Sequence, residues 1–271
     1  MKTENNYRLQ VRSRNTSCNA LRGMQVPHRT ILRLGSTTPT EDITHFRRVI
    51  EINSPEGCYL SSDKILMKQR FMHGKITTAE WFMVNPKDRK FKRVQHYFDK
   101  WRSPIIIKHK YSSKGNRIYL VHNMEEFNDF VSSMGRKLKI EDYIFERFYT
   151  YTREYRLHVT KEGCFYTCRK MLKQDAEVRW HRHENNSVWI LENNELFDRP
   201  KSWNKIVTEC VNALKALNLD VCAFDIKVQS NTHDDPKFII LESNSAPALG
   251  EVGIEKYKAQ ILKLIENARK A

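Results

Sequence analysis

The sequence predicts an α+β fold, because short strand-like runs and amphipathic helices follow one another along the chain. Within residues 219–250, two apolar runs flank the polar turn Gln229 to Pro236, a pattern typical of a β-hairpin. Residues 152–159 alternate charged and apolar side chains, as a half-buried strand does. Residues 202–217 instead repeat apolar side chains at helical spacing. A chain of 271 residues is long enough for one large or two small domains.

The first sixty residues predict a small lobe with little regular structure at its start. Residues 1–30 are polar and basic and show no clear period, so we expect an arm or a poorly packed segment there. Thr30–Leu34 and Val49–Ile52 then predict two short strands on either side of a turn-rich stretch.

Helices and strands are predicted in alternation over the rest of the chain. Ser61-Ser62-Asp63 suits a helix N-terminus, Asn85-Pro86 predicts the start of the next helix, and Asn123 caps a third. The remaining expected strands are 81–84, 105–108, 117–121, 143–148 and 165–172, and the last helix is expected over 254–268.

The composition predicts a globular protein with an acidic partner. The net charge is +15, and fifteen lysines and arginines against four acidic residues fall between Asp63 and Arg117. A solvated surface can carry such charge, but a concentrated positive field also attracts nucleotides, nucleic acid or acidic peptides. No stretch is long and apolar enough for a membrane span, and Met1 to Gln10 lacks the apolar core of a signal peptide. Six cysteines without a C-x-x-C pair predict reduced thiols in a cytoplasmic protein.

The hairpin carries a candidate metal site. Glu242 and Asn244 are two residues apart and point to the same face of a strand, and Asp225 lies mid-run on the partner strand. Two carboxylates and an amide oxygen are ligands that Mg²⁺ or Mn²⁺ takes. The alternative is a solvated acidic face, but carboxylates among core residues are costly without a compensating cation.

Two loops are candidates for binding anions. The strand that ends at Lys108 is followed by a loop, residues 109–116, with serines, lysines and a glycine that can donate to phosphate oxygens, although a plain polar turn is the alternative. Arg179–His183 is either a lid or anion clamp or an exposed basic loop, and its two histidines make a poor zinc site.

In this order along the chain, the phosphate-type loop, the charged strand pair and the acidic hairpin resemble the ATP-grasp superfamily of carboxylate–amine ligases, from about Ser61 to Gly250. The most specific match is Glu-x-Asn followed by Ser-x-Pro at residues 242–247. Ala223 and the Arg153-Glu-Tyr-Arg156 stretch are most similar to the branch that adds amino acids to peptides or protein tails.

The resemblance implies two α+β subdomains that sandwich ATP behind a short N-terminal lobe. The implied boundaries are a lobe at 1–60, a small subdomain with the phosphate-covering loop at 61–145, and a large subdomain with the metal hairpin at 146–271. It implies that Mg²⁺ or Mn²⁺ is held by Asp225, Glu242 and Asn244, and that Arg156, Arg169 and Lys170 contact the γ-phosphate or acyl phosphate. The implied ATP-binding residues are Lys64, Lys108, Ser112, Ser113, Lys114, Gly115, Glu146, Arg147, Phe148 and Glu154.

The resemblance also implies an ATP-dependent ligase that forms an amide or peptide bond through an acyl phosphate. The basic field favours an acidic peptide or protein tail as the acid, joined to an amine or amino acid. The chain departs from the family pattern in having a single glycine in the loop and a short first lobe, so nucleotide and metal binding follow more directly than the substrate. Two alternatives stay open: a nucleic-acid-binding protein with a retained nucleotide site, and a kinase that uses the same ATP site.

Overall fold

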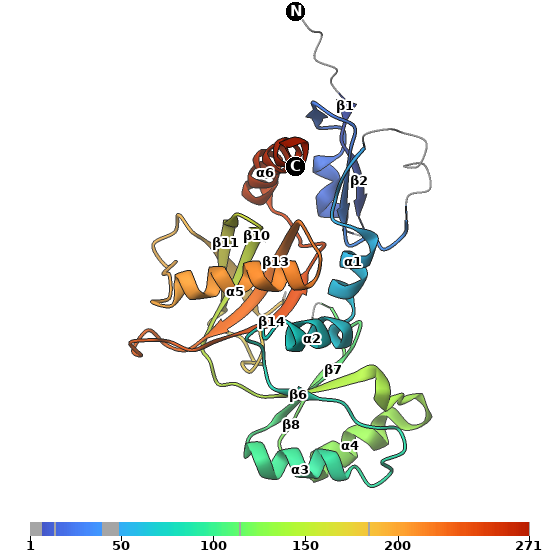
Figure 1. Ribbon diagram of the computed structural model, residues 1–271. Coiled ribbons are helices and arrows are strands. Elements are labelled where there is room, and N and C mark those ends of the chain that lie inside the picture. The colour runs from blue at the N-terminus through green and yellow to red at the C-terminus, as the bar shows by residue number, and fades with distance from the viewer. Residues whose placement is uncertain (1–6, 14, 40–48, 114, 184, 271) are drawn as a thin grey trace, which may run out of the picture.

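Three sheets account for most of the architecture, and the predicted α+β class is confirmed. The computed structural model describes residues 7–13, 15–39, 49–113, 115–183 and 185–270. Figure 1 shows an N-terminal sheet (blue), a large five-stranded sheet and a smaller four-stranded sheet with two helices.

The elements have the following bounds. The strands are β1 (Tyr7–Arg8), β2 (Gln10–Ser13), β3 (Gln25–Val26), β4 (Thr30–Leu34), β5 (Ile50–Ile52), β6 (Trp81–Phe82), β7 (Ile105–His109), β8 (Ile118–Val121), β9 (Tyr143–Arg147), β10 (Arg153–Thr160), β11 (Gly163–Leu172), β12 (Ser187–Leu191), β13 (Val221–Val228) and β14 (Phe238–Asn244). The helices are α1 (Pro55–Ser62), α2 (Lys64–His73), α3 (Lys92–Trp101), α4 (Met124–Met134), α5 (Trp203–Ala216) and α6 (Glu251–Lys270), with 3-10 turns η1 (Thr16–Leu21), η3 (Gly135–Lys137) and η4 (Ile140–Asp142).

The start of the chain is packed, so the expected arm was wrong for the described residues. β2, β4 and β5 form a parallel sheet, and β1 pairs with β3. Their buried side chains share one core with α6, in which Leu9, Leu32 and Ile52 join Tyr257 and Ile261. Strands of two to four residues are too short to show a period, which is why the sequence did not reveal them.

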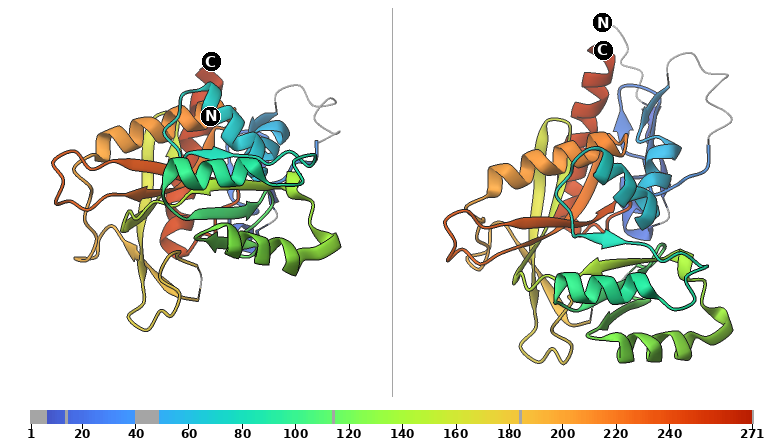
Figure 2. Two further views of the ribbon diagram at one scale, coloured as in Figure 1. Left: turned by 90° about the horizontal axis from the view of Figure 1, so that it is seen from below. Right: turned by 60° about the horizontal axis from the view of Figure 1, so that its bottom comes forward.

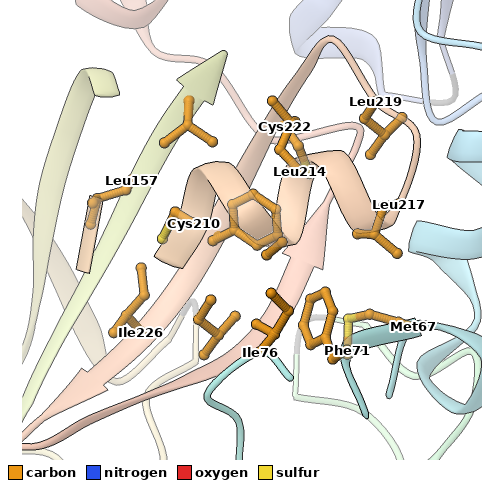
Figure 3. Close-up of a cluster of buried hydrophobic side chains, with 14 of the residues drawn as sticks. Met67, Phe71, Ile76, Leu157, Cys210, Leu214, Leu217, Leu219, Cys222 and Ile226 are labelled. Carbon is orange, nitrogen blue, oxygen red and sulfur yellow. The ribbon is translucent and has the colours of Figure 1, made fainter. Parts of the chain in front are cut away.

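The large sheet, in the order β12-β11-β10-β13-β14, is antiparallel and carries α5 on one face. The predicted alternation of β10 is confirmed, since Tyr155, Leu157 and Val159 lie in the core against this helix. α2 closes the other end of the same core, as Figure 3 shows for Met67 and Phe71. We therefore propose that the small subdomain begins after this helix, and not at residue 61 as expected.

The small sheet, β6-β9-β7-β8, packs α3 and α4 against one face. The expected helix start at Asn85-Pro86 was wrong, because the Asn85 side chain accepts from the Lys87 N–H (2.9 Å) and forms a turn. α3 begins only at Lys92, where the Asp88 carboxylate accepts from the first helical N–H groups.

The Ser61-Ser62-Asp63 stretch was predicted correctly in one part and wrongly in another. Asp63 caps α2 as expected, with Oδ1 accepting from the N–H groups of Ile65 and Leu66. The two serines before it end α1, a helix that was not predicted.

Within the described parts of the chain, every helix is too short or too polar to cross a membrane.

Candidate active site

The predicted hairpin forms, and its register brings the three candidate metal ligands to one face of the large sheet. β13 and β14 pair antiparallel, with Asp225 opposite Glu242 and Ala223 opposite Asn244. Because residues two apart on a strand share a face, all three candidate side chains project the same way. The ladder is irregular just after Asp225, and such irregularities are common beside active sites.

Each of the two carboxylates has a cation partner. Arg156, opposite Asp225 on β10, donates from Nε and Nη2 to the two carboxylate oxygens at 2.6 and 2.8 Å. Burial alone would raise the pKa of Asp225, but the guanidinium outweighs it and lowers the pKa, so the carboxylate stays charged. Lys64 Nζ lies 3.2 Å from Glu242 Oε2, and Glu242 keeps 31% of its side chain exposed.

These ligands fit a divalent cation that arrives with a nucleotide. Among the described residues, no three His, Cys, Asp or Glu side chains gather into a closed metal cage. The Asn244 Nδ2 atom, on the same face, is buried without a hydrogen-bond partner among the described residues. Mg²⁺ is commonly held by one or two carboxylates together with phosphate oxygens, which is the set that Asp225 and Glu242 offer.

A second charged cluster faces this hairpin from the small sheet. Glu146 is 1% exposed, and its two oxygens lie 2.8 Å from Lys68 Nζ and 2.5 Å from Lys108 Nζ. Burial opposes ionisation of Glu146, but the two ammonium groups outweigh it and lower its pKa to about 2. Burial lowers the pKa of Lys68, whereas the carboxylate of Glu146 outweighs burial at Lys108 and raises its pKa. The cluster therefore holds two buried cations on one carboxylate.

The expected hinge, residues 145–148, offers fewer free groups than predicted. Arg147 turns its side chain to Glu80 at 2.8 Å, and its N–H donates to the Glu80 carbonyl. The Phe148 N–H donates to the carbonyl of Pro104 at 3.0 Å. Both backbone donors are therefore engaged within the fold, and β9 is paired with β6 on one side and β7 on the other.

The Arg179–His183 loop lies over Glu154. Arg182 Nη1 is 3.4 Å from one Glu154 oxygen, and Lys170 Nζ is 3.7 Å from the other. Lys170 also donates to the Arg182 carbonyl at 2.6 Å. Burial raises the pKa of Glu154, and the Arg182 side chain is only 10% exposed. The loop is therefore packed against the site face at Arg182, whereas Arg179 is exposed.

The predicted phosphate loop lies close to the same Arg179–His183 loop. The Ser112 carbonyl accepts from Lys64 Nζ at 2.6 Å, and its hydroxyl is buried without a partner among the described residues. Ser113 is exposed, and Lys114 lies outside the described residues. Gly115 has a φ of +80°, and a Cβ there would lie 3.1 Å from His183 Cβ. Only glycine fits both the left-handed backbone and this close approach.

Arg169 does not reach the site, and its predicted catalytic role is withdrawn. It pairs with Tyr155 in the β10–β11 ladder and so lies on the α5 face of the sheet. There it donates to Asp198 Oδ1 at 2.6 Å and to the Leu196 carbonyl. Arg169 and Lys170 are neighbours on one strand and must project to opposite faces, so the two could never have served the same site.

Two residues on the site face were missed. Lys227 is 7% exposed, with Nζ 5.4 Å from the Phe148 ring centroid and 3.5 Å from the Trp180 carbonyl, and burial lowers its pKa to about 8. It lies two residues after Asp225, so strand alternation already contained the signal. Trp189 lies on β12, a strand that was not predicted, and its ring centroid is 4.7 Å from the Arg156 guanidinium.

Comparison with known proteins agrees with this architecture. The sequence matches the RimK-like ATP-grasp domain family over residues 60–265. The fold is similar to D-alanine–D-alanine ligase from Bacillus anthracis, with a TM-score of 0.62 and 13% identity over 88% of this chain and 78% of that one. It is similar to a RimK domain ATP-grasp protein from Sphaerobacter thermophilus, with a TM-score of 0.56 and 10% identity over 86% and 80% of the chains. It is also similar to the ATP-grasp ligase PsnB, solved with a minimal precursor. That comparison has a TM-score of 0.58 and 12% identity, and it covers 89% of this chain and 81% of that one.

No curated protein sequence matches the chain. The structural similarities occur at low identity and show the shared ATP-grasp fold alone. The family match, by contrast, spans most of the sequence and confirms the resemblance drawn from its motifs. The chain belongs to the RimK-like ATP-grasp family, whose members use ATP to join a carboxylate to an amine.

Proposed function

We propose that this ligase forms an amide or peptide bond through an acyl phosphate made on the sheet face that carries Asp225 and Glu242. The observation that supports this most is the meeting of carboxylates and cations from two sheets. Lys64 contacts both the Glu242 carboxylate and the Ser112 carbonyl of the phosphate loop, at 3.2 and 2.6 Å. The Lys68–Glu146–Lys108 cluster faces them from the small sheet.

ATP is proposed to lie between the two sheets. The hinge carbonyls and the Phe148 ring would hold the base, and Glu154 the ribose. Lys64, Lys108 and the loop residues Ser112, Ser113, Lys114 and Gly115 would hold the phosphates, because ammonium, hydroxyl and N–H groups all donate to phosphate oxygens. A divalent cation held by Asp225, Glu242 and Asn244 would neutralise phosphate oxygens during transfer.

The chemistry asks the chain mainly for positioning and charge. A substrate carboxylate oxygen attacks the γ-phosphorus, ADP leaves, and an acyl phosphate forms. An amine then attacks the carbonyl carbon, the C–O bond breaks, and inorganic phosphate leaves as the nitrogen loses a proton. Both anionic partners of the first step require cations, and Arg156 and Lys170 lie on the site face to supply them. Asp225 fixes the Arg156 guanidinium by its two hydrogen bonds.

The acid substrate is proposed to be an acidic peptide or protein tail. The support is the net charge of +15, which concentrates anionic partners near the molecule. The amine is proposed to be an amino acid, since the Arg153–Arg156 stretch resembles the branch that adds amino acids to peptides.

The test is ADP and phosphate release by the purified chain with Mg²⁺, ATP and pools of acidic peptides and amino acids. We expect release only when an acid and an amine are both present, with a product heavier by one amide-linked amino acid. A phosphorylated product that forms without an amine would mean a kinase. Release of ADP and phosphate in the absence of both the peptides and the amino acids would argue against ligation. Glu255→Gln, at an exposed pair with Lys258, serves as the control variant.

A further prediction tests whether Lys227 contributes to ATP binding or only to the stability of the fold. In Lys227→Met we expect ATP affinity to fall about tenfold, because a buried cation facing the phosphates and base is lost. Burial lowers the pKa of Lys227 to about 8, so at neutral pH the folded chain holds a charge that burial disfavours. Methionine does not carry this cost, so the stability of the ATP-free variant should rise. Calorimetric titration with ATP measures the affinity, and urea unfolding measures the stability. An unchanged ATP affinity would contradict a role of Lys227 in ATP binding.

A further inference from the structure

A band of cations covers the outer side of the small sheet. We call it the α3 ridge, and it comprises seven exposed side chains that begin just before α3 and end just after it: Lys87, Arg89, Lys90, Lys92, Arg93, Lys100 and Arg102. Only two acidic residues, Asp88 and Asp99, lie within the same stretch. The ridge is the densest part of the basic excess noted in the sequence.

The cations of the ridge have no carboxylate partner in the described parts of the chain. Asp88 accepts from the backbone N–H groups of Lys92 and Arg93, and Asp99 accepts from the Gln95 side chain. Some exposed lysines on α5 and α6 do have such partners: Lys205 pairs with Asp235, Lys258 with Glu255 and Lys270 with Glu266, each at 2.7 to 2.8 Å. The ridge therefore keeps a positive field that no neighbouring carboxylate in the described structure neutralises.

The ridge is separate from the candidate active site. Val94 and Trp101 of α3 are buried in the core that also contains Ile105 and Ile107 of β7. Lys108 alternates to the opposite face of that strand and pairs there with Glu146. Figures 1 and 2 show α3 on the outer side of the small sheet, away from β13 and β14. A molecule on the ridge thus lies across a sheet from the proposed ATP site.

The spacing of the cations suits a repeating anion. Lys92 and Lys100 lie eight residues apart on α3, about 12 Å along the helix axis, and Arg93 and Arg102 lie close to them in the sequence. The nearby aromatic rings are committed to the core, since Tyr97 stacks on Phe82 with centroids 4.1 Å apart. A surface that has cations but no free ring offers phosphate contacts without a platform for unpaired bases.

We propose that the α3 ridge binds the phosphate backbone of a double-stranded nucleic acid without reading its sequence. A duplex carries about one negative charge per 1.7 Å of axis, a density that several unpaired cations on one helix complement. This activity is additional to the proposed ligase function and does not depend on it. Binding at the ridge would hold the ligase near a nucleic-acid assembly. The candidate active site, on the opposite face of the small sheet, would stay open.

The test is the anisotropy of fluorescent duplex DNA and duplex RNA of unrelated sequences, titrated with the full chain between about 50 and 200 mM salt. We compare a ridge variant, Lys92→Gln/Arg93→Gln/Lys100→Gln, with a control that loses the same charge, Lys205→Gln/Lys258→Gln/Lys270→Gln. We expect the ridge variant to bind at least tenfold more weakly and to lose about three units of the slope of log K against log salt. The control should stay within about threefold, and both should keep the melting temperature of the unsubstituted chain.

Three outcomes overturn the proposal. The first is an unsubstituted chain that does not bind either duplex at the lowest salt. The second is an equal loss in the two variants, which would trace binding to net charge alone. The third is competition by polyglutamate at the same charge concentration as duplex, which would assign the ridge to acidic proteins. Comparison of the DNA and RNA arms identifies the duplex that is preferred.

Discussion

Asp225→Asn is expected to lower kcat of the ligase by about a hundredfold or more. The substitution removes one of two carboxylates proposed to hold the divalent cation, and it releases the Arg156 guanidinium from its two-point contact. It also leaves a buried arginine without its counter-charge, which costs roughly 3 kcal/mol of stability. ADP release and urea unfolding measure the two effects separately.

The double variant Arg156→Met/Asp225→Asn distinguishes lost chemistry from lost stability. Replacing both members of a buried pair by uncharged groups restores most of the stability that a single replacement removes. We therefore expect the double variant to unfold near the urea midpoint of the unsubstituted chain and to remain inactive. An Asp225→Asn chain with near-normal turnover would refute the role of this carboxylate.

Glu146→Gln is expected to cost about 3–5 kcal/mol of unfolding free energy. Lys68 and Lys108 would then be two buried cations that repel each other without the carboxylate between them. Adding Lys68→Met should recover part of the loss. Glu80→Gln, at an exposed pair with Arg147 in the same subdomain, should cost less than about 1 kcal/mol. Equal costs for the two single variants would show that the buried cluster does not stabilise the fold.

The same carboxylate predicts a pH dependence. The pKa of Glu146 falls from 4.5 to about 2 on folding, so the ionised form contributes about 3 kcal/mol above pH 4.5. This contribution is lost as the pH falls from about 4.5 toward 2. The stability gap between the unsubstituted chain and Glu146→Gln should therefore narrow in acid. Urea unfolding at pH 6 and pH 3 measures it.

Sequence periodicity was enough to predict four strands of the large sheet, including the β13–β14 hairpin. The alternation of residues 152–159 placed Tyr155 and Leu157 in the core, and two-residue spacing placed Glu242 and Asn244 on one face. These strands have seven to ten residues, long enough for a period to show. The same rule, applied consistently, would have excluded Arg169 and included Lys227.

Other features depended on contacts between distant residues and left no local signal. The Glu146 cluster joins α2, β7 and β9, and nothing in the sequence around Phe145-Glu146 indicates that its carboxylate would hold Lys68 as well as Lys108. The contact between the Arg182 guanidinium and the Glu154 carboxylate likewise joins residues twenty-eight positions apart. The expected helix at Asn85-Pro86 failed because the asparagine side chain forms a turn that competes with the helix.

The shared core of the N-terminal strands and α6 has a consequence during synthesis. Leu32 and Ile52 are synthesised well before Tyr257 and Ile261, which cover them in the folded chain. At translation rates of about 5–20 residues per second, the roughly 200 residues between them delay this closure by about 10–40 s. During that interval the nascent lobe exposes its apolar strands, so it would be a substrate for chaperones that bind growing chains.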